Sequence, residues 1–451
     1  MTADKTHGPR IDAARAVSLS DVVFLSDDWA PWAARPGVRI YLRPLGLADA
    51  TPGALPLAGG PLSFDRVELI LREPVQQAGT SPLPPAGEVG AAAAAPGEGP
   101  LSRPVPALTR KSSGFPTSPA TRERQRDEPA GSAPSGHVRT VAELDTLRRW
   151  AALRGLGDTI EGRLDRLSRP RPAFAGLDLR RPRVMGIVNV TPDSFSDGGD
   201  FADAGRAAAH GVALAEAGAD ILDIGGESTR PGSAAVSPAE EIARVVPVIR
   251  DLAGRGLVVS IDTRHAVVME AALAAGARIV NDVTALTGDP NSLAVVARAG
   301  CPVALMHIQG EPRTMQDAPV YDDVLLDVFD WLETRVDACL AAGIPLGSIA
   351  IDPGIGFGKK PVTHNLPLLR GLSLLHGLGC AQLLGVSRKR FIGSLTGVAD
   401  PKGRGPGSVA AGLYGVAQGV QMLRVHDVAE TRQALAVWSA LAAGEALEEG
   451  D

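Results

Sequence analysis

The sequence predicts an α/β fold in which residues 172–451 form a closed (β/α)8 barrel of the TIM-barrel class, preceded by an N-terminal extension. After about residue 171, short Val/Ile/Leu runs alternate with Ala-rich helical stretches, as expected for parallel strands that are covered on both faces. Eight such runs fall within this region, which suits eight βα units. A doubly wound open sheet is the alternative, but no GxGxxG turn follows the first run.

The eight predicted strands are apolar runs that end close to polar residues. They are RVMGIVNV (183–190), ADILDIGG (219–226), LVVSIDT (257–263), RIVNDVT (278–284), PVALMHI (302–308), SIAIDPG (348–354), AQLLGVS (381–387) and VQMLRVHD (420–427). Each run is followed by a stretch with helical composition, so each contributes one βα unit to the predicted barrel.

The chain before the barrel changes character along its length. Residues 1–75 contain two plausible strands, VRIYLRPLGL and FDRVELILRE, and predict a small α+β piece of unknown role. Residues 76–140 are rich in Pro, Ala, Gly and Ser, and predict a disordered linker because they hold too little apolar surface to offset chain ordering. Residues 141–171 carry apolar side chains at helical spacing and predict a helical connector.

Composition limits the classes of partner. The formal net charge of -6 argues against nucleic-acid binding and favours a small ligand. The three cysteines show no CxxC or metal-ligand spacing, which indicates reduced thiols in the cytoplasm. The start of the sequence has no apolar signal segment. Residues 405–423 are uncharged, but their five glycines and two glutamines favour a buried helix followed by a strand over a membrane span.

Polar side chains gather at the carboxyl ends of the predicted strands. In a (β/α)8 barrel these ends meet at one mouth, where active sites lie. An isolated Asp or Asn there is more simply explained as a helix cap, and Asp193 and Asp282 fit that explanation. The set as a whole favours a site, and its members are Asn189, Asp262, Asn281, Asp352, Lys389, Arg424 and His426.

The residue types indicate a ligand with an anionic end. Arg424 and His426 lie two positions apart on one strand and could clamp a phosphate group. Asn189 offers a neutral oxygen, and Mg²⁺ commonly binds one side-chain oxygen together with substrate phosphates and waters. A mobile loop with the sequence IGGESTRPGS follows the second strand and could close over the ligand.

The other members of the set suit a flat, polar heterocycle. Asp262, Asn281, Asp352 and Lys389 supply both hydrogen-bond donors and acceptors. Walker, HExxH and GxSxG motifs do not occur in the sequence.

The motifs of the barrel, taken in order, resemble those of one family. MGIVNVTPDSFSDGG, DIGGESTRPGS, SIDTR, VNDVTAL, MHIQGEPRTMQ, IDPGIGFGK, GVSRKRFIG and LRVHDV look like the successive motifs of dihydropteroate synthases, from about residue 172 to the end. The resemblance implies a TIM-barrel transferase of folate biosynthesis. Such an enzyme condenses 6-hydroxymethyl-7,8-dihydropterin diphosphate with p-aminobenzoate, and releases 7,8-dihydropteroate and pyrophosphate.

The resemblance also assigns residues to the parts of the site. It implies a pterin pocket of Asp262, Asn281, Met306, Asp352 and Lys389, of which Asp262, Asp352 and Lys389 would be catalytic. The implied diphosphate site comprises Asn189, Thr229, Arg424 and His426, with Mg²⁺ bound through Asn189. The implied p-aminobenzoate site comprises Phe195, Asp197, Thr229, Arg230, Pro231, Phe357, Ser387 and Lys389.

Two alternatives and two expectations accompany this interpretation. A pterin-binding methyltransferase that serves a corrinoid would share the ring pocket, but it needs no diphosphate clamp, so ESTRPG, SRK and RVHD argue against it. A non-catalytic pterin-binding paralogue is the second alternative. By family analogy we expect a homodimer that acts on small molecules, with no nucleic acid or membrane partner. Sulfonamide sensitivity is also expected, because these drugs imitate p-aminobenzoate.

Overall fold

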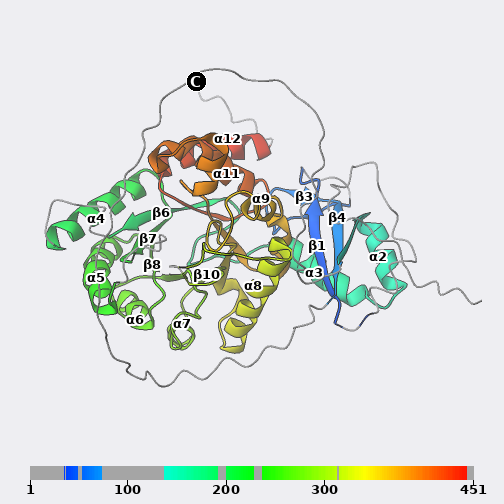
Figure 1. The fold of residues 1–451 in the computed structure, drawn as a ribbon, viewed down its shortest axis with the longest axis horizontal. Coiled ribbons are helices and arrows are strands. Elements are labelled where there is room, and N and C mark those ends of the chain that lie inside the picture. Colours follow the sequence, from blue (N-terminus) through cyan, green and yellow to red (C-terminus); the bar gives the residue numbers. More distant parts are fainter. Residues whose placement is uncertain are drawn as a thin grey trace, which may run out of the picture. The chain divides into compact units, whose positions relative to one another are not determined.

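The computed structural model describes residues 35, 37–48, 53–73, 137–190, 200–227, 236–311 and 314–443. The chain divides into two compact units, Met1–Glu73 with Gly136–Asp451, and Pro74–Ser135. The second unit falls outside the described residues, and so does the predicted linker except for its last four positions. Every element described below belongs to the first unit (Figure 1).

Eight parallel strands close into a barrel, in the order β10-β11-β12-β13-β6-β7-β8-β9. They are β6 (Arg183–Asn189), β7 (Ile221–Gly225), β8 (Val259–Asp262), β9 (Ile279–Asp282), β10 (Val303–Met306), β11 (Ile349–Asp352), β12 (Ala381–Gly385) and β13 (Met422–Val425). Each strand lies inside its predicted run, and the predicted (β/α)8 barrel is confirmed.

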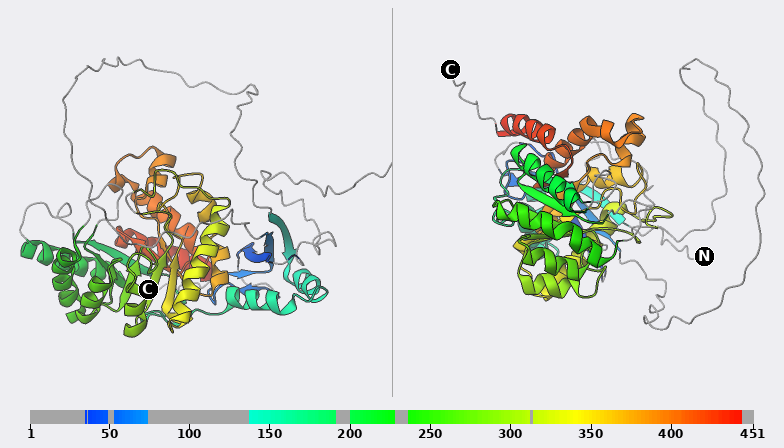
Figure 2. Two further views of the ribbon diagram at one scale, coloured as in Figure 1. Left: turned by 60° about the horizontal axis from the view of Figure 1, so that its bottom comes forward. Right: turned by 90° about the vertical axis from the view of Figure 1, so that its left-hand side faces the viewer.

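Helices cover the outside of the barrel (Figures 1 and 2). The α-helices are α4 (Asp200–Glu216), α5 (Pro238–Gly254), α6 (Ala266–Ala274), α7 (Ser292–Ala299), α8 (Val324–Ala341), α9 (Asn365–Arg370), α10 (Arg390–Thr396), α11 (Gly405–Val416) and α12 (Val428–Ala443). Short 3-10 turns are η3 (Leu346–Ser348), η4 (Leu372–Leu378) and η5 (Pro401–Arg404). With both faces covered, β7, β9, β10, β11 and β12 are buried along their whole length.

The uncharged stretch 405–423 forms α11 and the start of β13, as predicted. Among the described helices, none combines the length and the apolar character that a bilayer crossing requires. Cys301, Cys339 and Cys380 are free and buried.

The barrel interior changes from apolar at the amino ends of the strands to polar at the carboxyl ends. Side chains on alternate positions of a strand share one face, so an inward residue recurs every second position. Ile279, Ala350 and Met422 fill the barrel interior near the amino ends of the strands. Phe174 and Leu179 belong to the same buried apolar cluster. Two positions further along the same strands stand three members of the predicted site, Asn281, Asp352 and Arg424. Strand alternation therefore carries these side chains into the mouth.

The N-terminal extension forms a separate antiparallel sheet. Its order is β1-β4-β5, and two short strands pair beside it. The elements are β1 (Arg39–Leu45), β2 (Leu55–Pro56), β3 (Ser63–Phe64), β4 (Arg66–Arg72), β5 (His137–Glu143), α2 (Leu144–Ala152) and α3 (Gly157–Ser168). Leu69 and Leu71 of the sheet and Leu147, Trp150 and Leu164 of the helices share one buried cluster.

The boundaries predicted around residue 140 are wrong. The predicted disordered linker ends too late and the predicted helical connector begins too early, because residues 137–143 form β5. All seven positions pair with β4, from His137 opposite Arg72 to Glu143 opposite Arg66. The helix begins only at Leu144. Local helical spacing was outweighed by a partner strand more than sixty positions earlier in the chain.

Candidate active site

The mouth of the barrel brings together side chains from neighbouring strands. Asn189, Gly225, Asp262 and Asn281 are register partners across β6, β7, β8 and β9. Among these four register partners, only Gly225 has no side chain. A Cβ built there would lie 3.7 Å from Asp262 Oδ2 and 3.9 Å from Asn189 Oδ1. The two oxygens therefore lie near each other beside Gly225.

Arg424 lies between the buried carboxylate of Asp223 and the partly buried carboxylate of Asp262. Its Nε donates to Asp223 Oδ2 at 2.6 Å, and its Nη2 donates to Asp262 Oδ2 at 2.6 Å. Asp223 also accepts a hydrogen bond of 3.0 Å from Asn281 Nδ2. Asp223 thus orients two predicted site residues, although the sequence analysis did not select it. The signal that could have found it is an ionisable side chain in the middle of the apolar strand ILDIG.

The electrostatics of the mouth reflect its burial. Burial raises the pKa of Asp262 to about 7; the Arg424 guanidinium opposes this shift, and the Asp223 carboxylate adds to it. Burial also raises the pKa of Asp352, against the effect of Lys389. Burial lowers the pKa of Lys389 to about 8, while Asp352 opposes that change. Asp223, Asp262 and Asp352 share the mouth with the two cations Arg424 and Lys389. Each of these carboxylates that is ionised favours a ligand that gains positive charge.

Lys389 joins the mouth to the loop that follows β11. Its Nζ donates to the carbonyl of Ile355 and lies 4.5 Å from the centroid of the Phe357 ring. Asp352 Oδ1 accepts from Gly354 N at 2.7 Å. Gly354 has a φ of +66°, and a Cβ there would lie 1.9 Å from the carbonyl oxygen of His307. Only glycine permits this approach, which folds residues 353–358 against the end of β10.

Lys359 anchors the same loop from beneath, and sequence reasoning did not identify this role. Its side chain is 1% exposed. Its Nζ lies 2.9 Å from His307 Nδ1 and donates to the carbonyls of Gly354 and Phe357, each at 3.0 Å. Burial lowers the pKa of Lys359 well below its ordinary value. The motif IDPGIGFGK contains this lysine, but its contacts depend on how the loop turns back.

The remaining predicted residues of the described chain also lie at or beside the mouth. Met306 is buried at the end of β10, in a small apolar cluster with Val283 and Met315 that Phe357 packs against. Ser387 Oγ lies 2.9 Å from His426 Nδ1 and accepts a hydrogen bond of 3.1 Å from His426 N. Among the described residues, Arg424 donates to the carboxylates of Asp223 and Asp262, so joint clamping of an anion by Arg424 and His426 stays a prediction. Asp282 forms a local turn by accepting from Thr284 N and Leu286 N, but the next helix begins only at Ser292, so the predicted role of Asp282 as a helix cap is wrong.

Five predicted residues of the p-aminobenzoate site fall outside the described residues. They are Phe195, Asp197, Thr229, Arg230 and Pro231. Their assignments stay predictions, and so does the cap interpretation of Asp193.

A second acidic cluster lies behind the end of β7. Glu227, Glu241 and His265 each bring a possible ligand atom within 4.8 Å of the others. Arg264 already donates to both oxygens of Glu227, at 3.1 and 3.2 Å, which disfavours a cation at that carboxylate. Glu241 is fully buried on α5, and neither of its oxygens has a hydrogen-bond partner of good geometry among the described residues.

Glu241→Gln is expected to stabilise the protein at alkaline pH. Burial raises the pKa of Glu241 from 4.5 to about 7. Between these values the unfolded chain ionises while the folded protein keeps its proton, so stability falls as pH rises, and the loss is complete above the folded pKa. Gln removes this loss, worth up to about 3 kcal/mol. Urea unfolding at about pH 5 and about pH 8 measures it. A difference between wild type and variant that does not grow with pH would refute the explanation.

Comparison with known proteins identifies the family of the barrel. Residues 185–426, more than half of the chain, match the model of the family described as pterin binding enzyme. The dihydropteroate synthase of Neisseria meningitidis serogroup B is 52% identical over 271 residues, which are 59% of this chain and 94% of that one. The dihydropteroate synthase of Escherichia coli K12 is 46% identical over 262 residues, which are 58% of this chain and 92% of that one.

Solved structures agree with this result. Xanthomonas albilineans dihydropteroate synthase with 4-aminobenzoic acid has 53% sequence identity and a TM-score of 0.57, and the match covers 61% of this chain and 98% of that one. The same enzyme in complex with 7,8-dihydropteroate has 50% identity and a TM-score of 0.55, with 61% and 99% covered. With its closed barrel and its polar mouth, the chain belongs to the dihydropteroate synthase family of pterin-binding enzymes.

Proposed function

We propose that this enzyme joins 6-hydroxymethyl-7,8-dihydropterin diphosphate to p-aminobenzoate and releases pyrophosphate. The observation that carries the proposal is the convergence of Asn189, Asp262, Asn281, Asp352 and Arg424 on one mouth with Lys389 beside it. Its relatives of solved structure include complexes with 4-aminobenzoic acid and with 7,8-dihydropteroate, the second substrate and the product of this reaction.

The pterin ring would bind at the deeper, acidic part of the mouth. Asp262 and Asp352 can accept hydrogen bonds from the ring nitrogens, while Asn281 and Lys389 can donate to its oxygen and nitrogen acceptors. Met306 supplies an apolar wall at the end of β10. Asp223 holds Asn281 and Arg424 in orientation, so the donors and acceptors are preorganised before the ring arrives.

The reaction breaks the bond between the pterin methylene carbon and the diphosphate oxygen, and forms a bond between that carbon and the arylamine nitrogen. The electron pair of the broken bond leaves with the diphosphate, and the amine loses one proton. Positive charge develops on the methylene carbon and the ring as the leaving group departs. The Asp352 carboxylate and the other ionised carboxylates of the mouth stabilise this charge electrostatically. An arylamine is largely unprotonated at neutral pH and therefore needs no strong base.

We propose that Mg²⁺ binds at the edge of this site, through Asn189. The side-chain oxygen of Asn189 lies beside Gly225, as does Asp262 Oδ2, so a hard cation held by Asn189 would also be near that carboxylate. When bound, Mg²⁺ would supply charge neutralisation to the departing diphosphate. Arg424 and His426 are the protein groups proposed to hold the same diphosphate.

The p-aminobenzoate would bind above Lys389, beside the Phe357 ring and Ser387. The first two loops of the barrel would complete this pocket through Phe195, Asp197, Thr229, Arg230 and Pro231. An enclosed pocket would also keep water away from the developing cation. Because sulfonamides imitate this substrate, we propose that they compete for the same pocket; a dihydropteroate synthase of Yersinia pestis has been solved with a sulfonamide drug complex.

Pyrophosphate release from the pterin diphosphate is expected to require both p-aminobenzoate and Mg²⁺. The measurement is a coupled pyrophosphate assay with each component omitted in turn, and with mass detection of dihydropteroate. A corrinoid methyltransferase would instead consume methyltetrahydrofolate and leave the diphosphate intact. A non-catalytic paralogue would bind the pterin without turnover, and either result would overturn the proposal.

We further propose a cytoplasmic homodimer, by analogy with the family. The free, buried cysteines suit a reducing compartment. Light scattering of the purified chain gives the mass of the particle in solution, and a monomer at micromolar concentration would exclude the proposed assembly.

A further inference from the structure

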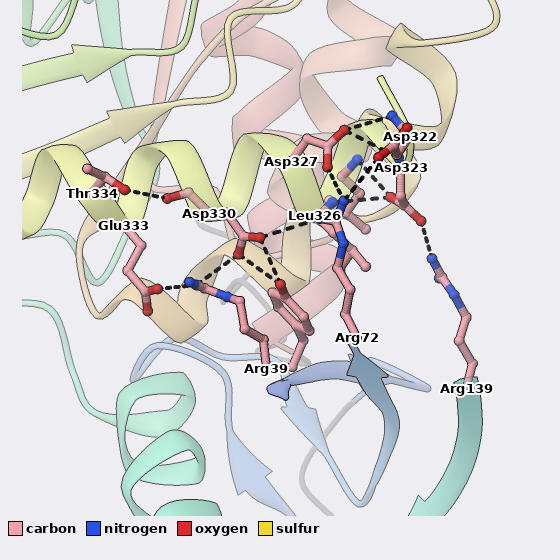
Figure 3. A network of polar contacts seen from close by, with 12 residues as sticks. Arg39, Arg72, Arg139, Asp322, Asp323, Leu326, Asp327, Asp330, Glu333 and Thr334 are labelled. Atoms are coloured by element: carbon pink, nitrogen blue, oxygen red, sulfur yellow. Dashed lines mark hydrogen bonds and ion pairs between the residues drawn. The ribbon is translucent and has the colours of Figure 1, made fainter. Parts of the chain in front are cut away.

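The N-terminal sheet contacts the barrel helix α8 through a set of side chains (Figure 3), and its strand β1 also packs against η4. Tyr41 of β1 places its ring against Phe329 in an edge-to-face contact, with ring centroids 5.4 Å apart. The Tyr41 hydroxyl donates to the Asp330 carboxylate at 2.8 Å. Tyr41 is 1% exposed and Phe329 is 2% exposed, so the sheet and the helix share a dry contact.

Three arginines of the sheet form a row along the acidic face of α8 (Figure 3). Arg39 pairs with Glu333 and, at 2.8 Å, with Asp330. Arg72 pairs with Asp327 at 2.6 Å and with Asp330 at 3.4 Å, and its side chain is only 3% exposed. Arg139 pairs with Asp323 at the start of the helix. Asp323, Asp327 and Asp330 share a face because helical residues three or four apart are neighbours.

The carboxylates held by Arg72 and Arg139 also shape the start of α8. Asp323 caps the helix by accepting from Leu325 N at 3.0 Å and from Leu326 N at 3.1 Å. Asp327 Oδ2 accepts from Asp322 N at 2.9 Å, while its other oxygen faces Arg72. The two arginines therefore fix the backbone of residues 322–326.

The residue before this turn reaches the active-site loop. The Tyr321 hydroxyl donates to the Gly358 carbonyl at 2.8 Å. The Tyr321 ring lies 5.9 Å from Lys359 Nζ, which in turn holds the carbonyls of Gly354 and Phe357. Gln316, from the same segment before α8, donates to the Gly356 carbonyl at 2.5 Å. The loop that presents Phe357 to Lys389 is thus supported from the start of α8.

We propose that the N-terminal extension positions the p-aminobenzoate side of the active site, with Arg72 and Arg139 as positioning residues that act through Asp327, Asp323 and Tyr321 on residues 353–358. The proposal rests on the proposed function, because it assigns this loop to the second substrate. The extension lies outside the matched family region, residues 185–426, so this support is an addition to the common barrel. Packed side chains with a single arrangement can carry such coupling between distant positions.

The double variant Arg72→Met/Arg139→Met is expected to raise KM for p-aminobenzoate about tenfold, a size typical of coupling between sites. The KM for the pterin diphosphate should stay within about twofold, because Asn281 and Asp262 are held by Asp223 and Arg424 on other strands and not by this loop. Arg39→Met is the matched control. It removes two ion pairs from the same interface, at the far end of the row from Tyr321. Steady-state rates of pyrophosphate release give both KM values for the wild type, the double variant and Arg39→Met.

Hydrogen exchange separates this proposal from the proposed function, because it needs no turnover. Amides of residues 354–360 should exchange faster in the double variant and remain as in wild type in Arg39→Met. If wild type shows no synthase activity while this exchange difference is found, the coupling stands and the assigned reaction fails. Equal changes in amide exchange in the double variant and in Arg39→Met would mean that the arginines only hold the sheet on α8. That result would overturn the proposal.

Tyr321→Phe carries the test if the double variant does not fold. It removes the hydrogen bond to Gly358 and leaves the arginine row intact. The same rise in KM for p-aminobenzoate is expected, with kcat changed less than KM. An unchanged KM for p-aminobenzoate in Tyr321→Phe would contradict the proposed coupling between α8 and the loop.

Discussion

Arg424→Ala is expected to lower kcat/KM by about a hundredfold or more, the range found when one preorganised charge-stabilising donor is removed. The guanidinium bridges Asp223 and Asp262 at 2.6 Å each, so alanine leaves one buried and one partly buried carboxylate without their cation. The proposed diphosphate site loses a positive charge at the same time. Initial rates of pyrophosphate release, with both substrates varied, measure the loss.

Stability must be measured beside activity, because breaking a buried ion pair typically costs about 3–5 kcal/mol. Arg424→Lys is the conservative control: it keeps the charge but cannot bridge two carboxylates as a planar fork does. Asp223→Asn tests the bridge from its other side and keeps both catalytic carboxylates. We expect Arg424→Lys to fold and to recover only part of the rate. Near-normal turnover in Arg424→Ala, in protein that melts like wild type, would contradict the assignment.

Lys389→Ala is expected to reduce turnover by a comparable factor, about a hundredfold, because one side chain borders both proposed substrates. Its ammonium donates to the Ile355 carbonyl and lies over the Phe357 ring. Alanine leaves Asp352 without its neighbouring cation and removes a contact of the loop. KM should therefore rise for both substrates, whereas the Arg72 and Arg139 variants should affect only p-aminobenzoate.

The pH dependence of the wild type provides an independent check on Lys389. Burial lowers the pKa of this lysine to about 8, so its positive charge is present below that value and is lost as pH rises through it. Turnover should fall above about pH 8, and Lys389→Arg should remove that fall because a guanidinium stays charged. A rate that is flat to about pH 10 in wild type would exclude a role for the charged form.

Much of the barrel could be predicted from local sequence. Parallel strands covered on both faces require continuous apolar runs, and the eight observed strands lie within the eight predicted ones. Since the carboxyl ends of such strands must meet, Asn189, Asp262, Asn281 and Asp352 could be assigned to one mouth from their positions alone. In a closed barrel of parallel strands, all carboxyl ends lie on the same side, so the site must lie at that end of every strand.

Local patterns could not show which partners these residues choose. Asp223 meets Arg424 across 201 positions of sequence, and Lys359 meets His307 only because Gly354 and its loop turn back on β10. The sequence prediction divides β5 between the end of a disordered linker and the beginning of a helix. It is a strand because β4 offers seven backbone partners. Contacts between distant segments depend on packing in three dimensions, where burial and charge act across strands and helices that periodicity treats one at a time. Strand composition therefore determined the barrel and the end of it that carries chemistry, whereas tertiary contact alone decided how the arginines, carboxylates and lysines are paired.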